Sequence, residues 1–247
     1  MSASPITNPD RTLSPRGGEG EPGYGAEGGL FRRLKTACAA EWRAYTWHPF
    51  VQGIADGSLP LPAFRRYLLQ DYLFLVQFVR AYALAAYKAE SLPAFRDKAA
   101  AIGALLHEMT LHVGYCAEWG IAEAQILAEP EAPETVAYTR WVLDRGIAGD
   151  ILDLEVALAP CTVGYGEIAL AIEASPARQR AGNPYESWIA MYAGAEYQAL
   201  ARGSAARLDA LGESHGGAAR FASLAADFAK AARLEADFWA MGLRAGG

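Results

Sequence analysis

The sequence predicts an all-α protein, a single-domain helical bundle. From Leu30 onward the chain has helical character almost throughout, and no segment shows a convincing alternating strand pattern. Several prolines and glycines stand where helices would begin or end. The chain has 247 residues, of which 52% are hydrophobic, so it is long enough for one domain with a sizeable core.

Residues 1–28 differ from the rest of the chain in composition. They are rich in glycine, serine and proline and nearly free of aliphatic side chains. Such a segment cannot bury enough apolar surface to offset the entropy lost on ordering. We therefore expect a disordered tail at 1–28 and the folded domain at 29–247. An artefact at the start of the sequence is the alternative, and we assign no function to this segment.

The first half of the domain predicts three helices. Leu30 to Tyr45 would form the first, followed by a turn-rich connector from Trp47 to Pro60. Pro62 suits the first turn of a long second helix that reaches about Glu90, because its missing N–H would be unsatisfied there anyway. The third helix would run from Pro93 to about Trp119, just before a glycine.

The second half predicts four more helices after a proline-rich loop at residues 129–133. Asn183 and Pro184 read as the cap and first residue of the third of these. The expected spans are Glu134 to Arg145, Asp150 to just before Pro176, Asn183 to about Leu211, and a last helix that ends near Leu243. Seven helices with short connections make a bundle.

Charge and cysteine content narrow the functional classes. The net charge of -6 and the lack of a Lys/Arg stripe argue against nucleic-acid binding. No uninterrupted apolar run reaches the roughly 18 residues of a membrane span, and the N-terminus lacks a signal-peptide pattern. Cys38, Cys116 and Cys161 are far apart, and none belongs to a CxxC pair. We expect no nucleic-acid partner, no membrane partner and a reducing cytoplasmic setting.

The expected fifth helix contains one proline, which is followed by a cysteine. A proline inside a helix removes a backbone donor and costs roughly 3 kcal/mol or more. Tyr165 follows Cys161 at i,i+4 spacing, so its phenol shares a helical face with the sulfur. We hypothesise that the chain presents Cys161 as a nucleophile in a buried aromatic pocket.

Two carboxylates lie on apolar helix faces. Asp71 has apolar or aromatic neighbours at i±3 and i±4, and Glu235 precedes Phe238 and Trp239 on its face. A buried carboxylate without a partner is costly. Each therefore serves either a structural hydrogen bond or a functional one, and burial would raise a carboxyl pKa toward the range useful for acid–base chemistry.

Aromatic residues and histidines leave further alternatives open. The tyrosines and phenylalanines could simply fill the core, but buried tyrosines need partners for their hydroxyls, which favours a pocket with polar groups. His107 and His112 are spaced i,i+5, and these positions point about 140° apart on a helix. That spacing does not fit the zinc pattern of two histidines at i,i+4, so we expect no metal site.

The ordered motifs resemble the TenA/thiaminase II family, in its cysteine-containing branch. The matching segments are Trp47 to Gly57, Leu69 to Tyr72, Pro160-Cys161 with Tyr165 and Glu167, Pro184-Tyr185 with Trp188, Ile189 and Tyr192, and Glu235-x-x-Phe238-Trp239. This resemblance covers Leu30 to Leu243. It implies a heme-oxygenase-like fold, a homotetramer, and no metal or other cofactor.

The resemblance also implies an activity. Members hydrolyse 4-amino-5-aminomethyl-2-methylpyrimidine to the 5-hydroxymethyl pyrimidine in thiamin salvage, and they cleave thiamin as a related activity (thiaminase II). By the same resemblance, Cys161 would form the covalent adduct, Glu235 would be the acid that protonates the leaving group, and Asp71 would bind the amidine edge of the ring. The substrate-binding positions would be Tyr138, Tyr165, Tyr192, Phe74 and Phe238.

This chain departs from the usual family pattern at two places. Phe74 stands where many relatives have tyrosine, and Thr162-Val163 follow the cysteine where bulkier residues are frequent. Both changes bear on which substrate fits. The alternatives to the hydrolase are a non-catalytic pyrimidine- or thiamin-binding protein and another enzyme on the same fold, such as a metal-dependent oxidase or a quinone-cofactor synthase.

Overall fold

The prediction of an all-α fold is confirmed. The computed structural model describes residues 23–246, apart from the side chains of residues 104, 108, 111 and 112. Within this range the chain forms helices and no strand. The helices are α1 Leu30–Ala37, α2 Ala39–Thr46, α3 Pro49–Asp56, α4 Leu61–Tyr87, α5 Leu92–Glu118, α6 Glu123–Ala128, α7 Pro133–Ala148, α8 Ile151–Ala174, α9 Glu186–Ala193, α10 Ala195–Ser214 and α11 Phe221–Arg244.

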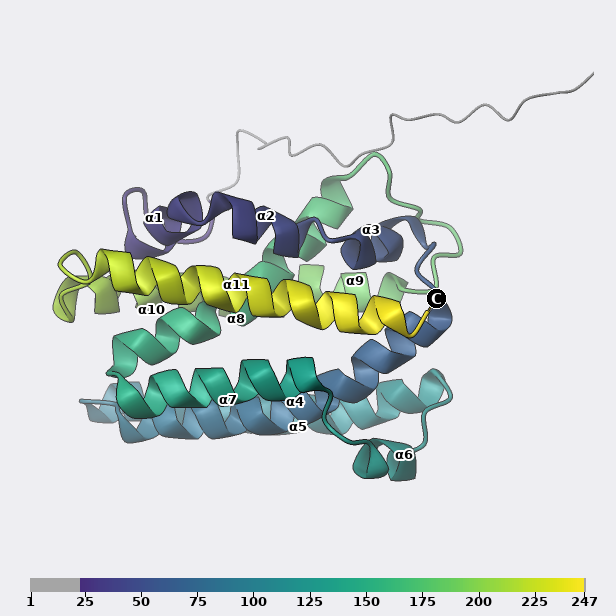
Figure 1. The fold of residues 1–247 in the computed structure, drawn as a ribbon, viewed down its shortest axis with the longest axis horizontal. Coiled ribbons are helices and arrows are strands. Elements are labelled where there is room, and N and C mark those ends of the chain that lie inside the picture. Colours follow the sequence, from purple (N-terminus) through teal and green to yellow (C-terminus); the bar gives the residue numbers. More distant parts are fainter. Residues whose placement is uncertain (1–22, 247) are drawn as a thin grey trace, which may run out of the picture.

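Two long helices organise the bundle. Figure 1 shows α11 running along the molecule, with α1–α3 on one side and α7 with α4 on the other. Helix α11 packs against α2, α4, α7 and α8, while α8 also packs against α9 and α10. Side chains from α4, α7, α8 and α11 therefore meet in one interior region.

Helix α8 is the most apolar of these elements. Its length and composition would allow it to cross a membrane, but 78% of its apolar 18-residue stretch is buried inside this fold. The core helix of a globular protein passes the same test of length and hydropathy. Its burial between α7, α9, α10 and α11 accounts for its composition.

The connector predicted between Trp47 and Pro60 is wrong in part, because it contains α3. Pro49 occupies the first helical position, and the Nδ1 of His48 accepts a hydrogen bond from the Phe50 N–H at 3.2 Å. Burial lowers the pKa of His48 to about 4, so the ring stays neutral and can accept. Gly57 ends the helix with a φ of 75°, a conformation that suits glycine.

Two of the predicted helices are broken. The first one divides at Cys38, whose φ of -113° and ψ of 31° are not helical. The predicted helix from Asn183 divides into α9 and α10 at Gly194, and it begins later than expected. Asn183 is not its cap, because α9 begins only at Glu186. The Asn183 Oδ1 accepts from the Tyr185 N–H at 2.9 Å in the preceding turn, and its amide donates to the Ile54 carbonyl. Helix α6 was not predicted, whereas α4, α5, α7, α8 and α11 lie within a few residues of their expected spans.

The segment predicted as a tail extends into the folded part of the protein. Residues 1–22 lie outside the described residues. Residues 23–28 are held against α10: the Tyr24 hydroxyl donates to the Gln198 Oε1 at 2.6 Å, and the Ala26 N–H donates to the Asp209 Oδ2 at 2.7 Å. The ordered domain therefore begins before residue 29.

Candidate active site

Helix α8 continues through Pro160 and presents Cys161 at the edge of an interior pocket. Gly164 permits a close approach on the same helix, because an added Cβ would lie 2.3 Å from the Tyr45 ring. Tyr45 is fully buried there, and its hydroxyl donates to the Pro160 carbonyl at 3.4 Å. The turn that contains Pro160 is thus packed against a buried aromatic ring from α2.

Glu235 lies beside the cysteine. It is 2% exposed on α11, and its Oε1 accepts a hydrogen bond from the Tyr138 hydroxyl at 2.8 Å. The Cys161 thiol hydrogen-bonds to the same carboxyl. Burial raises the pKa of Glu235 to about 8, and the bonds from Tyr138 and Cys161 only partly oppose that rise. A carboxyl with a pKa near neutrality that hydrogen-bonds to a thiol can accept the thiol proton.

Asp71 lines the same pocket from α4. It is 7% exposed, and burial raises its pKa to about 7. The Tyr67 hydroxyl, one turn earlier on α4, donates to this carboxylate and opposes the rise. At neutral pH Asp71 therefore carries a partial negative charge that can pair with a polar ligand edge.

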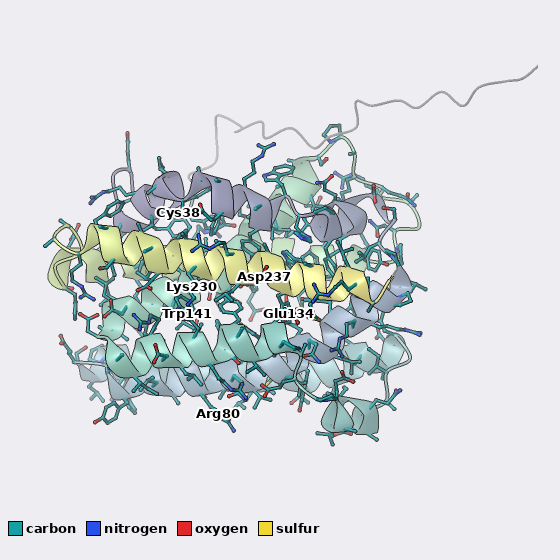
Figure 2. The ribbon with its side chains drawn as sticks, viewed as in Figure 1. Cys38, Arg80, Glu134, Trp141, Lys230 and Asp237 are labelled. Atoms are coloured by element: carbon teal, nitrogen blue, oxygen red, sulfur yellow. The ribbon has the colours of Figure 1, made fainter. Side chains whose placement is uncertain are left out.

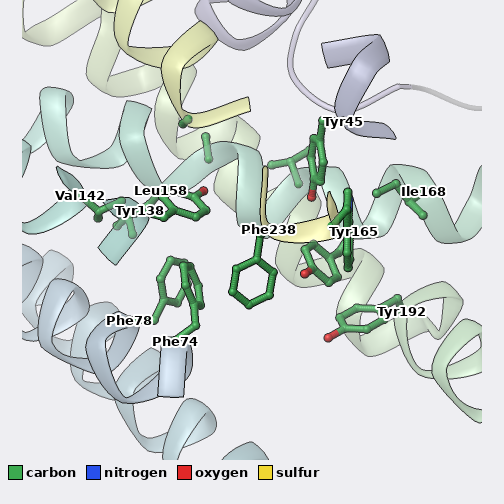
Figure 3. Packing of buried hydrophobic residues seen from close by; sticks show 14 of the residues in the cluster. Tyr45, Phe74, Phe78, Tyr138, Val142, Leu158, Tyr165, Ile168, Tyr192 and Phe238 are labelled. Atoms are coloured by element: carbon green, nitrogen blue, oxygen red, sulfur yellow. The ribbon is translucent and has the colours of Figure 1, made fainter. Parts of the chain in front are cut away.

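The pocket walls are rich in aromatic side chains, and the cavity has a volume of about 70 Å³, which is room for several water molecules. Its lining residues come from α4, α5, α8, α9 and α10: Asp71, Phe74, Leu75, Phe78, Tyr82, Ala101, Leu105, Cys161, Thr162, Tyr165, Tyr192, Tyr197 and Leu200. Figure 3 shows Phe74, Phe78, Tyr165 and Tyr192 between the helices.

The predicted binding residues occupy two layers of this region. Phe74, Tyr165 and Tyr192 line the cavity itself. Tyr138 and Phe238 are not among the lining residues; their rings lie 5.1 and 5.8 Å from the Phe74 ring, centroid to centroid. In this structure Tyr138 acts on the site through Glu235, and Phe238 supports the wall from behind.

Other pocket residues were not singled out from the sequence. Tyr82 and Phe78 follow Phe74 at i+8 and i+4 on α4, a helical spacing that could have identified them. Tyr67 does not line the cavity, but it precedes Asp71 by one turn on α4. Tyr197 comes from α10, and its hydroxyl donates to the Thr162 carbonyl at 3.1 Å. No local pattern marks Tyr197, because the α9–α10 break sets its position.

Several motif residues are structural. Glu167 binds Lys35 at 2.5 Å and accepts a hydrogen bond from Trp42, away from the pocket. Gln70 is fully buried; its Oε1 accepts hydrogen bonds from the Ala132 N–H at 2.8 Å and the Thr135 hydroxyl at 2.7 Å. Gln70 thereby fixes the start of α7, the helix that carries Tyr138.

Two ionisable residues outside the pocket are exposed to solvent. Asp237 is exposed on the outer face of α11, two residues from the buried Glu235 (Figure 2). His107 is exposed on α5. In the part of the chain that the structure describes, no group of three or more histidine, cysteine or acidic side chains could hold a metal ion.

Comparison with known proteins identifies relatives of this chain. Residues 36–245 match the profile of the TENA/THI-4/PQQC family. A protein of Halalkalibacterium halodurans named aminopyrimidine aminohydrolase is 36% identical over 203 residues, which cover 81% of this chain and 89% of that protein. A Bacillus subtilis protein of the same name is 30% identical over 213 residues, covering 85% of this chain and 88% of that protein.

Solved structures agree with these matches. A protein from Silicibacter sp. TM1040, described as a TenA family transcription regulator, is 40% identical and superposes with a TM-score of 0.81, covering 89% of this chain and 97% of that one. A domain from Shewanella denitrificans with a heme oxygenase-like fold superposes with a TM-score of 0.66 at 14% identity, covering 87% and 92% of the two chains. The second likeness concerns the fold alone.

Proposed function

Because this chain belongs to the TENA/THI-4/PQQC family, we propose that it is an aminopyrimidine aminohydrolase. Its substrate would be 4-amino-5-aminomethyl-2-methylpyrimidine, converted to the 5-hydroxymethyl pyrimidine in thiamin salvage, and thiamin cleavage would be a related activity. One observation carries the proposal: the Cys161 thiol hydrogen-bonds to Glu235 at the edge of a cavity that Asp71 also lines.

The first step forms a bond between Cys161 and the pyrimidine ring. The ionised Glu235 carboxylate accepts the thiol proton, and the thiolate adds to a ring carbon, so that the electron pair moves into the ring. The hydrogen bond between the two groups provides the path for that proton. The pKa of about 8 keeps part of Glu235 ionised at neutral pH.

The second step exchanges the amine for water. The ring electron pair expels the aminomethyl nitrogen, which leaves as ammonia with the proton now on Glu235. Water then adds to the exocyclic carbon and returns a proton to Glu235. The carbon–sulfur bond breaks last, and the cysteine leaves as a thiolate that Glu235 reprotonates, so that atoms and charge balance over the cycle.

Asp71 would bind the polar edge of the ring. The amidine edge of an aminopyrimidine carries an exocyclic N–H donor next to a ring nitrogen that can take a proton. A carboxylate there stabilises the protonated ring, which is the form that most readily accepts a thiolate. The aromatic walls would contact the flat apolar faces of the same ring.

We also propose that the protein is a cytoplasmic homotetramer. Multi-angle light scattering would test the tetramer by measuring its molar mass in solution.

Replacement of Cys161 by serine is the direct test. The Cys161→Ser variant should lose at least about a thousandfold in kcat, because a hydroxyl is a far weaker nucleophile than a thiolate at neutral pH. Chromatography of the pyrimidine product, with ammonia measured in parallel, gives turnover for the aminomethyl pyrimidine and for thiamin.

Cys38→Ser is the matched control. Cys38 is buried on the far side of α11, where its thiol donates to the Ala225 carbonyl at 3.2 Å, and a serine hydroxyl can make the same bond. The control should keep wild-type turnover. Near-normal turnover in Cys161→Ser would overturn the nucleophile assignment. Tight pyrimidine binding by the wild type, without product over hours, would instead favour a non-catalytic binding protein.

A further inference from the structure

The Tyr67 hydroxyl is the centre of a buried hydrogen-bond cluster beneath the pocket. Tyr67 is 1% exposed and is not among the residues that line the cavity. Its hydroxyl accepts a hydrogen bond from the Trp188 Nε1–H at 3.2 Å. It also hydrogen-bonds to Asp71, Tyr165 and Tyr192. One oxygen thus connects side chains of α4, α8 and α9.

The donors and acceptors of this cluster can be counted. A phenolic oxygen has one O–H to donate and two lone pairs to accept with. The Tyr67 proton goes to the Asp71 carboxylate, because that bond stabilises the ionised acid. Trp188 can only donate and takes one lone pair. The Tyr165 and Tyr192 hydroxyls are left to share the other.

The shared Tyr67 lone pair affects the two tyrosine hydroxyls that face the cavity. Tyr165 and Tyr192 both line it, and their ring centroids are 4.9 Å apart. When one of the two hydroxyls donates to Tyr67, the other can turn to a ligand without leaving a Tyr67 lone pair unsatisfied. Tyr67 therefore couples the direction of both pocket phenols to the orientation of Asp71.

We infer that Tyr67 is a positioning residue for the proposed hydrolysis: it orients Asp71 and favours its ionised form, and it sets which pocket phenol faces the substrate. This inference rests on the proposed function. Tyr67 acts through Asp71 and the two tyrosines, since it does not reach the cavity itself.

The groups around Asp71 show why this one bond matters. The negative charge of Asp71 contributes to raising the pKa values of three groups around it. These are Glu235 on α11, Cys116 on α5 and Tyr165 on α8. Burial also opposes ionisation of Asp71. The hydrogen bond from Tyr67 is the interaction that lowers the pKa of Asp71. Its removal should therefore raise that pKa further.

Tyr67→Phe tests the inference, because it deletes the hydroxyl and keeps the ring that packs on Phe50 and Trp239. We expect the acid limb of the kcat/KM profile to move up by about one pH unit, with kcat/KM at neutral pH falling about tenfold or more. Carbon-13 NMR of the Asp71 carboxyl, assigned with Asp71→Asn, should report the same upward shift without substrate.

Tyr185→Phe is the matched control. Tyr185 is equally buried, and its hydroxyl donates to the Leu59 carbonyl, away from Asp71. It should lose stability like Tyr67→Phe but keep the wild-type pH profile. If the two variants give the same profile and Asp71 titrates as in the wild type, Tyr67 is only structural and the inference is wrong. Absence of turnover in the wild type would count against the proposed function alone, because the NMR titration does not depend on it.

Discussion

At the scale of single residues, burial controls the chemistry of the site. Asp71 and Glu235 have their pKa values raised to about 7 and about 8, and desolvation is the main cause for both. Asp237, two residues away from Glu235 on α11, faces solvent. The same helix thus carries one buried carboxyl that can exchange protons at neutral pH and another carboxyl that is exposed to solvent.

Glu235→Gln tests the role of the buried carboxyl in proton transfer. The variant keeps an acceptor for Tyr138 but cannot transfer a proton, so turnover should fall about a hundredfold or more. A carboxyl with a raised pKa also destabilises the fold as it ionises. The wild type should therefore lose stability relative to Glu235→Gln as pH rises from about 4.5 through about 8.

Thermal unfolding at a series of pH values measures this difference. The gap between the melting temperatures of variant and wild type should widen in favour of the variant from pH 5 to pH 8 and then level off. Asp237→Asn, on the exposed face of the same helix, should show no such trend. A constant gap for Glu235→Gln would mean that the carboxyl titrates normally.

At the scale of helices, close packing around α8 positions the thiol. An ideal Cβ on Gly164 would lie 2.3 Å from the Tyr45 ring, and Tyr45 itself contacts the turn that contains Pro160. The sequence shows that Pro160 directly precedes Cys161, but it does not identify the aromatic ring that packs against this turn. That ring comes from α2, far away in the sequence.

Gly164→Ala sets two effects against each other. Alanine favours a helix over glycine by about 1 kcal/mol, whereas overpacking a core costs about 1–3 kcal/mol. Because the clash is with a rigid, buried ring, we expect net destabilisation and reduced kcat. Urea unfolding measures the change in stability, and a turnover assay measures the change in kcat.

Gly203→Ala on α10 is the control for helix propensity. An added Cβ there meets nothing within 4 Å, so the variant should gain about 0.5–1 kcal/mol. Stabilisation of both variants by the same amount would show that Tyr45 does not constrain α8.

At the scale of the whole molecule, one buried ion pair connects the outer helix α5 to the core. Lys98 on α5 and Glu155 on α8 are 4% and 3% exposed, and they hydrogen-bond to each other. Burial lowers the pKa of Lys98, while the charge of Glu155 opposes that change. Among the described residues, α5 packs mainly against α4 and α6, and this pair links it to α8.

Glu155→Ala should therefore destabilise the protein by about 3–5 kcal/mol in urea unfolding, because it leaves the buried Lys98 without its partner. The double variant Lys98→Met with Glu155→Leu should recover part of that loss, since it removes both members of the pair. Arg207, whose Nε lies 3.6 Å from the Glu155 Oε2, loses that contact in both variants. The exposed pair Arg140 and Glu131 provides a control, because Arg140→Ala should cost less than about 1 kcal/mol. Equal losses in the single and double variants would show that packing volume, rather than the unpaired charge, is the cause.

The sequence by itself determined the all-α class, the approximate spans of five helices and the inward faces of Asp71 and Glu235. These features depend on local physics: proline and glycine at helix ends, and side chains that recur with the helical period. Helix α3 was missed because the connector was read as turn-rich, although Pro49 and Gly57 already marked its two ends.

The tertiary structure alone decided which of these residues meet. The bond between Cys161 and Glu235, the Tyr67 cluster, and the anchoring of residues 23–28 on α10 all join segments that are distant in the sequence. Helical periodicity specifies the face on which a side chain lies, but not the helix that the face will contact. Close packing of the bundle makes that choice, and it places a carboxyl beside the thiol after Pro160.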